Sequence, residues 1–461
     1  MRKIFNFSIL FSLIISVGLS QERLEKVFTL ESAISMAIAR NPIIKAEEYE
    51  VQGANMDIRK ALIKKYIPSV NFDAEFGIVP GAKGDIFYSP DKQTDLDDLG
   101  PFYKFDLTLA LPLYTFGGIS SVVEATRQNL GIKESKKDLA TADLSLQVVR
   151  AYWGLSSAEK TESLAKSSLE SFEQLLSEIQ KRLQDEDSEV DDSDLLEAKT
   201  YRIDIEKIRQ ESIQNKDLAT KAFNVLLDLN LNEHVITSDE TSPVFIFDEN
   251  SQDQFISLGG EQRPEIEGLQ SAINAIQAKI NLTESQRLPV FYIAAGFSYA
   301  HAGNRYDQTN PFVVDHFNYR NIGFLFGLKW NPNIFFHNAE IQKNRLQYQA
   351  ALEKMRLLRA KIGLEVSQAF IEARKNDALL KAAKESLKAA KTWLQISLDN
   401  WEMGIGDSYR LLRAYQAYFR LRGEEIKREY EFNVSLAKLA YILGDMDLYL
   451  TWVKDGKTNL A

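Results

Sequence analysis

The sequence predicts an α+β fold that is mostly α, organised as a tandem repeat of long coiled-coil helices plus four β-strands. Three observations predict it. Prolines recur about 220 residues apart, as expected for an internal repeat. Residues 113–242 and 333–461 contain no proline. Four segments of about 10–12 residues alternate apolar and polar side chains, the length and pattern of tilted membrane strands.

The first twenty residues are typical of a secretory signal peptide. Arg2 and Lys3 precede an apolar stretch, and the small residues Gly18 and Ser20 stand at the positions expected before a cut at Gln21. After residue 20 no run of about 18 apolar residues follows, so no membrane-spanning helix is expected. An exported chain of this kind is expected to be either soluble or a β-barrel.

The proline pattern indicates a duplication. Three prolines of the first half have partners in the second, at offsets that fall from 222 to 220: Pro42 with Pro264, Pro68 with Pro289 and Pro112 with Pro332. We therefore expect a first structural repeat over residues 21–240 and a second over residues 241–461.

Proline costs about 3 kcal/mol inside a helix, so the long segments without it permit very long helices. In the first repeat we expect a helix over 43–66, strands over 68–78 and 102–113, a long helix over 118–184 and a helix over 192–229. In the second we expect a helix over 265–287, strands over 289–301 and 320–331, a long helix over 335–402 and a helix over 407–443. The seam from Ile362 to Trp401, which steps by four and three residues, predicts coiled-coil packing.

The strand segments favour a membrane sheet over a soluble sheet packed on helices. Their polar faces carry charges that suit a wet lumen, among them Asp73, Glu75, Lys104 and Asp106, and aromatic residues gather near the strand ends. Four strands cannot close on themselves, and a free edge is not viable in lipid. Three copies would supply a 12-stranded β-barrel joined to a 12-column α-helical tube.

Several short motifs resemble the TolC-like outer-membrane efflux family, the outer-membrane factor of tripartite pumps. They are Thr29-Leu30-Glu31-Ser32-Ala33-Ile34 with Ala37 and Asn41-Pro42, then Leu111 to Gly118, and Arg263-Pro264-Glu265-Ile266. The resemblance implies a homotrimeric, passive exit duct in outer-membrane lipid, with a long periplasmic extension that meets a periplasmic adaptor and an inner-membrane pump. Small molecules would be the cargo. Export of protein by type I secretion and a secreted coiled-coil scaffold without channel activity are the alternatives.

The resemblance also implies a gate where the second long helix turns. In the family this turn contains a glycine and acidic residues ring the entrance. Gly404 matches the glycine, whereas Arg410 and Arg413 stand where acidic residues often occur, and the equivalent place in the first repeat holds Asp194 and Glu197. The candidate tip residues are Trp401, Gly404, Asp407, Arg410, Arg413, Asp194 and Glu197.

We hypothesise that the two arginines pair with Asp194 and Glu197 to hold the entrance shut and weaken cation preference. The alternative is that these charges only solvate exposed helix ends. The turn of the first repeat is strongly acidic, at Asp185, Glu186, Asp187, Glu189, Asp191 and Asp192.

Enzyme chemistry and cofactors are not expected. The chain has no cysteine, its four histidines are scattered, and it contains no phosphate-binding loop, zinc-protease motif or nucleophile elbow. A formal net charge of −10 without a basic stripe argues against nucleic acid as a partner. The turn over 331–338 lacks the Gly-Gly of its counterpart, which leaves a tight turn there in doubt. Residues 231–262 and 444–461 are expected to form a belt around the tube.

Overall fold

The computed structural model describes residues 26–83, 95–184, 190–238, 242–245, 247, 251–259, 263–308, 310, 312, 314–405, 407–455 and 457–458. The predicted signal peptide, residues 1–20, lies outside this range. So do four acidic residues of the predicted first-repeat turn, Asp185, Glu186, Asp187 and Glu189.

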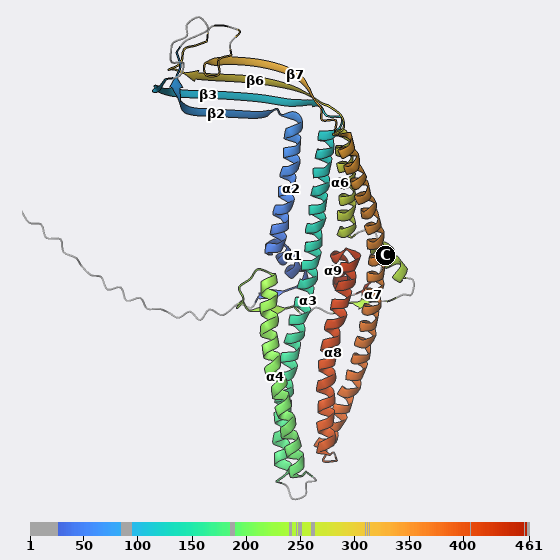
Figure 1. Ribbon diagram of the computed structural model, residues 1–461. Helices are drawn as coiled ribbons and strands as arrows, with labels where there is room; N and C mark the ends of the chain where they lie inside the picture. Colours follow the sequence, from blue (N-terminus) through green and yellow to red (C-terminus); the bar gives the residue numbers. More distant parts are fainter. Residues whose placement is uncertain are drawn as a thin grey trace, which may run out of the picture.

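The molecule is elongated, with one sheet at one end and helices running away from it (Figure 1). The sheet contains β2 (Ser69–Gly81), β3 (Asp95–Tyr114), β6 (Val290–Ala302) and β7 (Tyr319–Lys329). All neighbouring pairs are antiparallel, in the order β2-β3-β6-β7. The predicted fold, mostly α with long helices and four strands, is confirmed.

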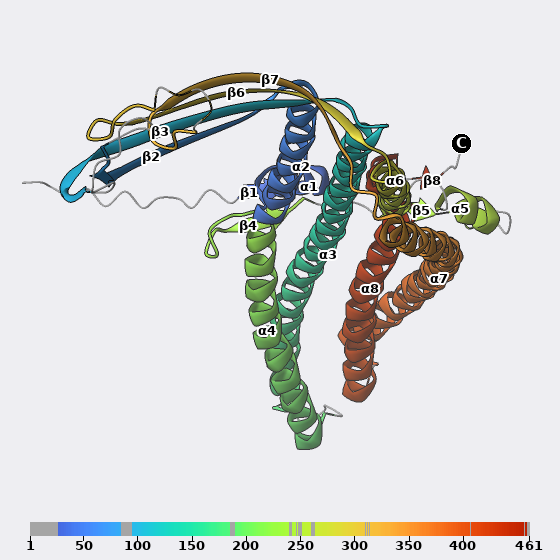
Figure 2. The ribbon, with the colours of Figure 1, turned by 45° about the horizontal axis from the view of Figure 1, so that its top comes forward.

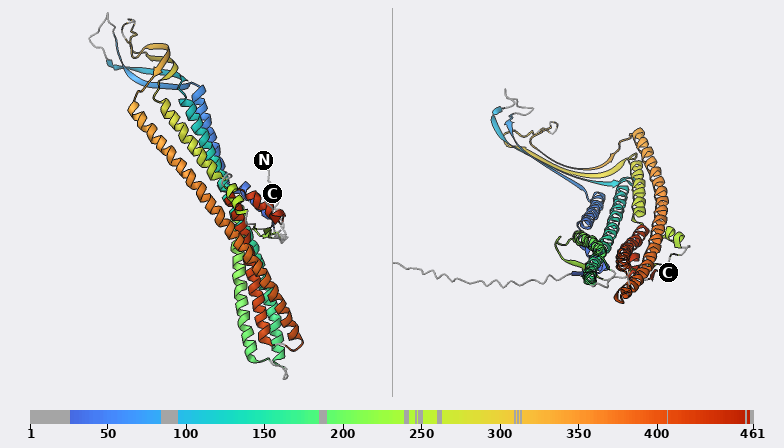
Figure 3. Two further views of the ribbon diagram at one scale, coloured as in Figure 1. Left: turned by 90° about the vertical axis from the view of Figure 1, so that its right-hand side faces the viewer. Right: turned by 90° about the horizontal axis from the view of Figure 1, so that it is seen from below.

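Two long helices run beside pairs of shorter ones. The long helices are α3 (Gly118–Arg182) and α7 (Ile334–Glu402), and the shorter ones are α2 (Pro42–Tyr66), α4 (Asp192–Leu226), α6 (Pro264–Ser285) and α8 (Ser408–Leu443). Figure 1 shows α2 above α4 beside α3, and α6 above α8 beside α7. The 65 residues of α3 make it roughly 100 Å long at 1.5 Å per residue. The left view of Figure 3 shows the helices as one long column that runs away from the sheet.

The helix starts follow from local chemistry. Pro42 and Pro264 occupy the first helical position of α2 and α6, where a missing N–H costs nothing. The Asn41 side chain accepts a hydrogen bond from the Ile43 backbone N–H at 3.0 Å and also donates to the Leu226 carbonyl, so it ties the start of α2 to the end of α4. Arg263, at the equivalent position before α6, is instead buried and pairs with Glu265 and Glu365.

The middle of the molecule contains short elements that connect the two halves: helices α1 (Leu30–Arg40), α5 (Ser251–Gly259) and α9 (Met446–Asp455), and strands β1 (Lys26–Phe28), β4 (Val235–Thr237), β5 (Val244–Phe245) and β8 (Lys457–Thr458). Strand β1 pairs in parallel with β4, and β5 pairs in parallel with β8. Each pair joins the start of one half to its end, a pattern that occurs twice along the chain.

The main apolar core lies at this middle level. Trp153 of α3 is buried, and its indole N–H donates to the Tyr449 hydroxyl of α9 at 2.8 Å. Trp452 of α9 packs edge-on against Phe255 of α5. A second, separate core lies at the far end of the helices from the sheet.

The sheet has one apolar and one polar face. On β2 the residues Phe72, Phe76 and Ile78 are exposed, and β7 exposes Ile322, Phe324 and Phe326 in the same alternation. On the other face Lys104 lies 3.3 Å from a Glu75 carboxylate oxygen and 3.0 Å from one of Asp106. No helix in the described part of the chain is both long enough and apolar enough to cross a bilayer.

The two strand-to-helix turns differ. Between β3 and α3, Phe116 and Gly117 both have positive φ, of 49° and 84°, and the turn is tight. Between β7 and α7 the described backbone has no positive φ; Asn333 caps the helix by accepting a hydrogen bond from the Phe336 N–H. The second half therefore turns without the Gly-Gly pair, and α7 is four residues longer than α3, with 69 residues against 65.

Candidate functional site

The ends of the two helical hairpins, far from the sheet, hold every predicted site residue. The α7–α8 turn contains Trp401, Gly404 and Asp407, and the start of α8 carries Arg410 and Arg413. Asp194 and Glu197 lie in the first two turns of α4, in the neighbouring hairpin. Both hairpin ends lie at the bottom of Figure 1.

Gly404 allows the α7–α8 turn because its φ is +73°, a conformation that costs other residues roughly 1–2 kcal/mol. Its N–H donates to the Trp401 carbonyl at 3.1 Å, and the Ile405 N–H donates to the Asn400 carbonyl at 3.0 Å. These two bonds form a Schellman motif, which satisfies carbonyls at the end of α7. A Cβ at Gly404 would meet nothing within 4 Å, so backbone conformation rather than space requires the glycine.

Asp407 starts α8. Its carboxylate accepts a hydrogen bond from the Tyr409 N–H at 2.9 Å. The equivalent role at α4 belongs to Asp191, which forms a reciprocal capping box with Asp194: Asp191 accepts from the Asp194 N–H at 3.0 Å, and Asp194 accepts from the Asp191 N–H at 3.2 Å. The Asp194 carboxylate, predicted as a gate charge, is thus also part of a helix cap.

Trp401 is the centre of the tip core. It is only 4% exposed and packs with Phe172 and Ile179 of α3 and Leu412 of α8. The end of α7 is thereby fixed against α3 by apolar contact. Fully burying an aromatic side chain of this size removes a large apolar area from water, which stabilises the contact between the two hairpins.

Arg182, at the end of α3, holds Trp401 from outside the core. Its guanidinium lies 4.0 Å from the centre of a Trp401 ring, and it donates to the Trp401 backbone carbonyl at 2.8 Å. Glu178 lies 3.6 Å from the same guanidinium. The Trp401 indole N–H has no hydrogen-bond partner among the described residues. Sequence reasoning missed Arg182, because nothing in the local pattern shows that an arginine at the end of one hairpin stacks on a tryptophan 219 residues further along.

The predicted charge pairs are not formed within one chain. Among the described residues no ion pair joins Arg410 or Arg413 to Asp194 or Glu197. Arg413 instead lies over the Tyr409 ring, with its guanidinium carbon 5.5 Å from the ring centre. Burial and the Glu197 carboxylate raise the pKa of Tyr201, while Arg413 opposes that rise, so both charges act on one phenol.

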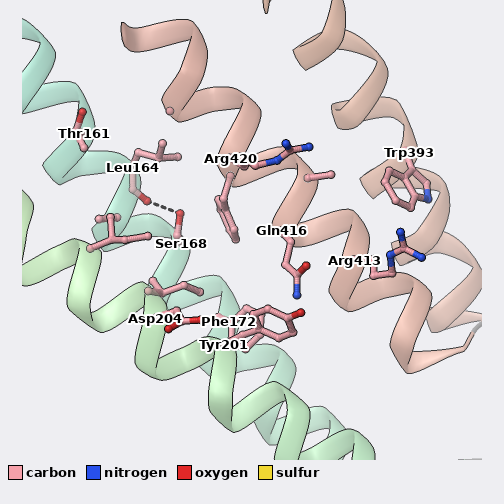
Figure 4. Close-up of a pocket in the computed structure, with 16 residues that line it drawn as sticks. Thr161, Leu164, Ser168, Phe172, Tyr201, Asp204, Trp393, Arg413, Gln416 and Arg420 are labelled. Atoms are coloured by element: carbon pink, nitrogen blue, oxygen red, sulfur yellow. Dashed lines mark hydrogen bonds between the residues drawn. The ribbon is translucent and has the colours of Figure 1, made fainter.

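A cavity of about 620 Å³ opens beside the tip core (Figure 4). Helices α3, α4 and α8 line it, with Trp393 from α7. Figure 4 shows Gln416 extending from α8 toward Phe172 and Tyr201. The amide nitrogen of Gln416 is buried and has no partner in the described part of the chain. The two hairpins are therefore incompletely packed against each other next to the tip.

Within the described ranges, no group of three or more His, Cys, Asp or Glu side chains is placed to hold a metal ion. The described part of the tip contains a glycine turn, two helix caps, a buried tryptophan and exposed charges.

Comparison with known proteins identifies the class. The model of the family described as "Outer membrane efflux protein" matches residues 33–185 and 256–445, which together span both halves of the fold. The chain belongs to this family. A search of curated proteins gave no match.

Solved structures share the fold. A membrane protein from Pseudomonas aeruginosa is 18% identical, with a TM-score of 0.71 over 90% of this chain and 92% of that one. The open state of the MtrE outer-membrane channel from Neisseria gonorrhoeae is 16% identical, with a TM-score of 0.70 over 90% and 89%. The Campylobacter jejuni CmeC outer-membrane channel is 15% identical, with a TM-score of 0.68 over 93% and 90%.

The chain is therefore an outer-membrane efflux channel and not an enzyme. It belongs to the outer membrane, with a helical extension into the periplasm. Members of the family form trimeric channels that work with pump partners.

Proposed function

We propose that three copies of this chain join edge to edge into one duct, a 12-stranded β-barrel continued by a tube of twelve helical columns. Through this duct small molecules would leave the periplasm passively, delivered by an inner-membrane pump through a periplasmic adaptor. In this proposal residues 21–240 and 241–461 are tandem structural repeats, each contributing two strands and two columns.

The observation that carries this proposal is that both lateral edges of the sheet are open. Among the described residues, β2 pairs only with β3, and β7 pairs only with β6. Both edge strands expose apolar side chains on the same face. A sheet edge in lipid leaves backbone N–H and C=O groups without partners, at several kcal/mol each, so β2 of one copy needs β7 of the next.

The helices below the two edge strands support the same contact. Helix α2 exposes Tyr49, Met56 and Ile63, each seven residues apart, and the upper part of α7, at the same height below the sheet, exposes Leu346 and Leu357. A seven-residue apolar stripe is the pattern of a coiled-coil contact. Figures 1 and 2 both show α2 and α7 on opposite sides of the protomer, where one copy would meet the next.

The entrance of the duct, in this proposal, is the tip made by the α7–α8 turn and its neighbours. Around a three-fold axis Arg410 and Arg413 supply six positive charges, beside Asp194 and Glu197 of an adjacent hairpin. The cavity beside the tip core leaves space between the α7–α8 and α3–α4 hairpins, so the core around Trp401 is what holds them together at this end.

Cysteine cross-linking tests the edge contact, because the chain has no native cysteine. Phe72→Cys on β2 is combined, one at a time, with Ile322→Cys, Phe324→Cys, Phe326→Cys and Leu328→Cys on β7. Oxidation in outer-membrane fractions should give dimers and trimers, and nothing larger, for at least one pair. Phe72→Cys alone is the control. A ladder that continues beyond three copies, or monomer for every pair, would refute the closed trimer.

A further inference from the structure

We infer that the β7–α7 turn anchors the channel in the periplasmic leaflet of the outer membrane, with Phe335 and Phe336 among the acyl chains and nearby cations on anionic phospholipid headgroups. The inference rests on the proposed function, because it takes the sheet as the membrane wall. It concerns the junction between sheet and helices, which the gate mechanism does not use.

The turn presents an unusual amount of aromatic surface. Phe335 is 90% exposed, Phe336 is 61% exposed and Trp330 is 54% exposed. The side chain of Trp330 continues the alternation of Ile322, Phe324 and Phe326, and so lies on the apolar face of the sheet. The aromatic patch is thus continuous with the face that meets lipid.

The patch exists at only one of two equivalent junctions. The β3–α3 junction makes a tight turn through Phe116 and Gly117, and Phe116 is far less exposed than Phe335. At the 220-residue offset that relates Pro112 to Pro332, α7 begins four residues earlier than α3. This additional turn carries Ile334, Phe335 and Phe336. Phe335 and Phe336 therefore follow β7 directly, where the sheet meets the helices.

The indole of Trp330 is oriented for an interface. Its N–H donates to the Arg287 backbone carbonyl at 3.1 Å, at the end of α6. The ring is therefore held by its polar edge toward the helical side while its apolar body stays exposed. Tryptophan with one wet end and one apolar end is typical of the boundary between headgroups and acyl chains.

Charge at this level favours anionic lipid. The cations where the helices meet the sheet are Lys64 and Lys65 in the last turn of α2, Arg287 just after α6 and Lys329 at the end of β7. The acidic residues at the neighbouring helix ends are already paired: Glu124 with Arg127, Glu284 with Arg345 and Glu340 with Lys343. Lys64, Lys65 and Arg287 make no ion pair within the described part of the chain. Unpaired cations at this level are attracted to an anionic lipid surface.

A lipid and a second protein copy are the two surfaces that can cover Phe335, since α7 is a lateral helix. Fluorescence quenching separates them. Phe335→Trp is placed in a Trp330→Phe background, and the full chain is reconstituted in vesicles of phosphatidylcholine brominated on the acyl chains near the glycerol. Trp330→Phe alone gives the signal of the remaining tryptophans, which is subtracted.

The introduced indole should lose most of its fluorescence in brominated vesicles and keep it in unbrominated ones. A trimer whose introduced indole is not quenched by brominated lipid would overturn the anchor, whether the indole is quenched by aqueous iodide or by neither quencher. Absence of the trimer itself would refute the proposed function instead, so the two failures are distinguishable.

Headgroup preference is tested on the trimer by native mass spectrometry after extraction from vesicles that contain phosphatidylglycerol. The triple variant Lys64→Gln, Lys65→Gln, Arg287→Gln should retain severalfold fewer phosphatidylglycerol molecules than the parent. The matched control, Lys384→Gln, Lys388→Gln, Lys391→Gln, lies on the lower part of α7 and should retain the parental number. Equal retention by both triple variants would contradict the electrostatic part of the inference.

Discussion

The two helical hairpins end in different ways although they occupy equivalent places in the two halves of the chain. The α3–α4 end is acidic and begins its second helix with a reciprocal capping box between Asp191 and Asp194. The α7–α8 end uses Gly404 with φ of +73°, a single cap from Asp407, and basic residues on α8. Only the second end inserts a tryptophan between the hairpins.

The difference shows how the α7–α8 turn is fixed in place against the α3–α4 hairpin. Trp401 of α7 is buried against α3 and covered by Arg182, so the α7–α8 turn is fastened to the other hairpin at one aromatic contact. The turn between α3 and α4 contains no tryptophan. Releasing Trp401 should therefore free the α7–α8 turn without unfolding α3–α4, as an entrance that opens requires.

The largest effect is expected from Trp401→Ala. Removing a buried aromatic side chain costs about 3–5 kcal/mol, and here the loss falls on the contact between hairpins. Amide hydrogen exchange of tip peptides should accelerate, and conductance in planar bilayers should rise if the turn narrows the entrance. Ile396→Ala, at a half-exposed position of the same helix that does not line the cavity, is the control and should change both little. Equal effects of the two variants would show that the α7–α8 turn is not held specifically by the buried Trp401.

Glycine substitutions should have opposite signs at two positions. Gly404→Ala must place a Cβ on a residue at positive φ, which costs roughly 1–2 kcal/mol. Gly423→Ala lies in the interior of α8 with free space around it, where alanine gains about 0.5–1 kcal/mol. Local exchange rates measure both. A neutral Gly404→Ala would show that the turn is not constrained as described.

The caps compare the two ends directly. Asp191→Ala and Asp407→Ala each remove a side-chain acceptor at a helix start, at about 1 kcal/mol. Asp191→Ala should have the larger effect, because it also leaves Asp194 without its reciprocal role. Exchange in the first turns of α4 and α8 reports the difference. Asp191→Asn, which keeps an acceptor oxygen, is expected to restore most of the loss at α4.

The smallest effect on stability is expected from Arg410→Asp with Arg413→Asp. Both arginines are exposed, and exposed pairs contribute only about 0–1 kcal/mol. Ion selectivity is the readout: reversal potentials across a salt gradient should move toward cation preference, because six positive charges become negative in the trimer. Unchanged reversal potentials would remove these arginines from the entrance.

Much of the fold could be predicted because its signals are local. Proline positions marked helix starts such as Pro42 and Pro264, and strict alternation marked β2 and β7. Strand β3 begins at Asp95, earlier than the predicted 102, because pairing with β2 extends an acidic segment that resembles a loop in isolation.

The middle elements could not be predicted in detail. Strands β1 and β4 are three residues each and pair in parallel across more than 200 residues, so neither has a pattern of its own. The tip residues likewise fall into those that the sequence can predict and those that it cannot. Gly404 and Asp407 have local signals, a glycine and an acidic residue in a short turn, whereas the stacking of Arg182 on Trp401 exists only once two hairpins are brought together.

The native mass of protein extracted in detergent from outer-membrane fractions tests the central claim most directly. The account predicts a particle of about three times the 52.4 kDa chain, less the predicted signal peptide of each copy. No larger particle should form when the protein concentration is raised. A monomer recovered from the soluble fraction would contradict it, because the free edges of β2 and β7 and the apolar face between them would then have neither a partner copy nor lipid to cover them.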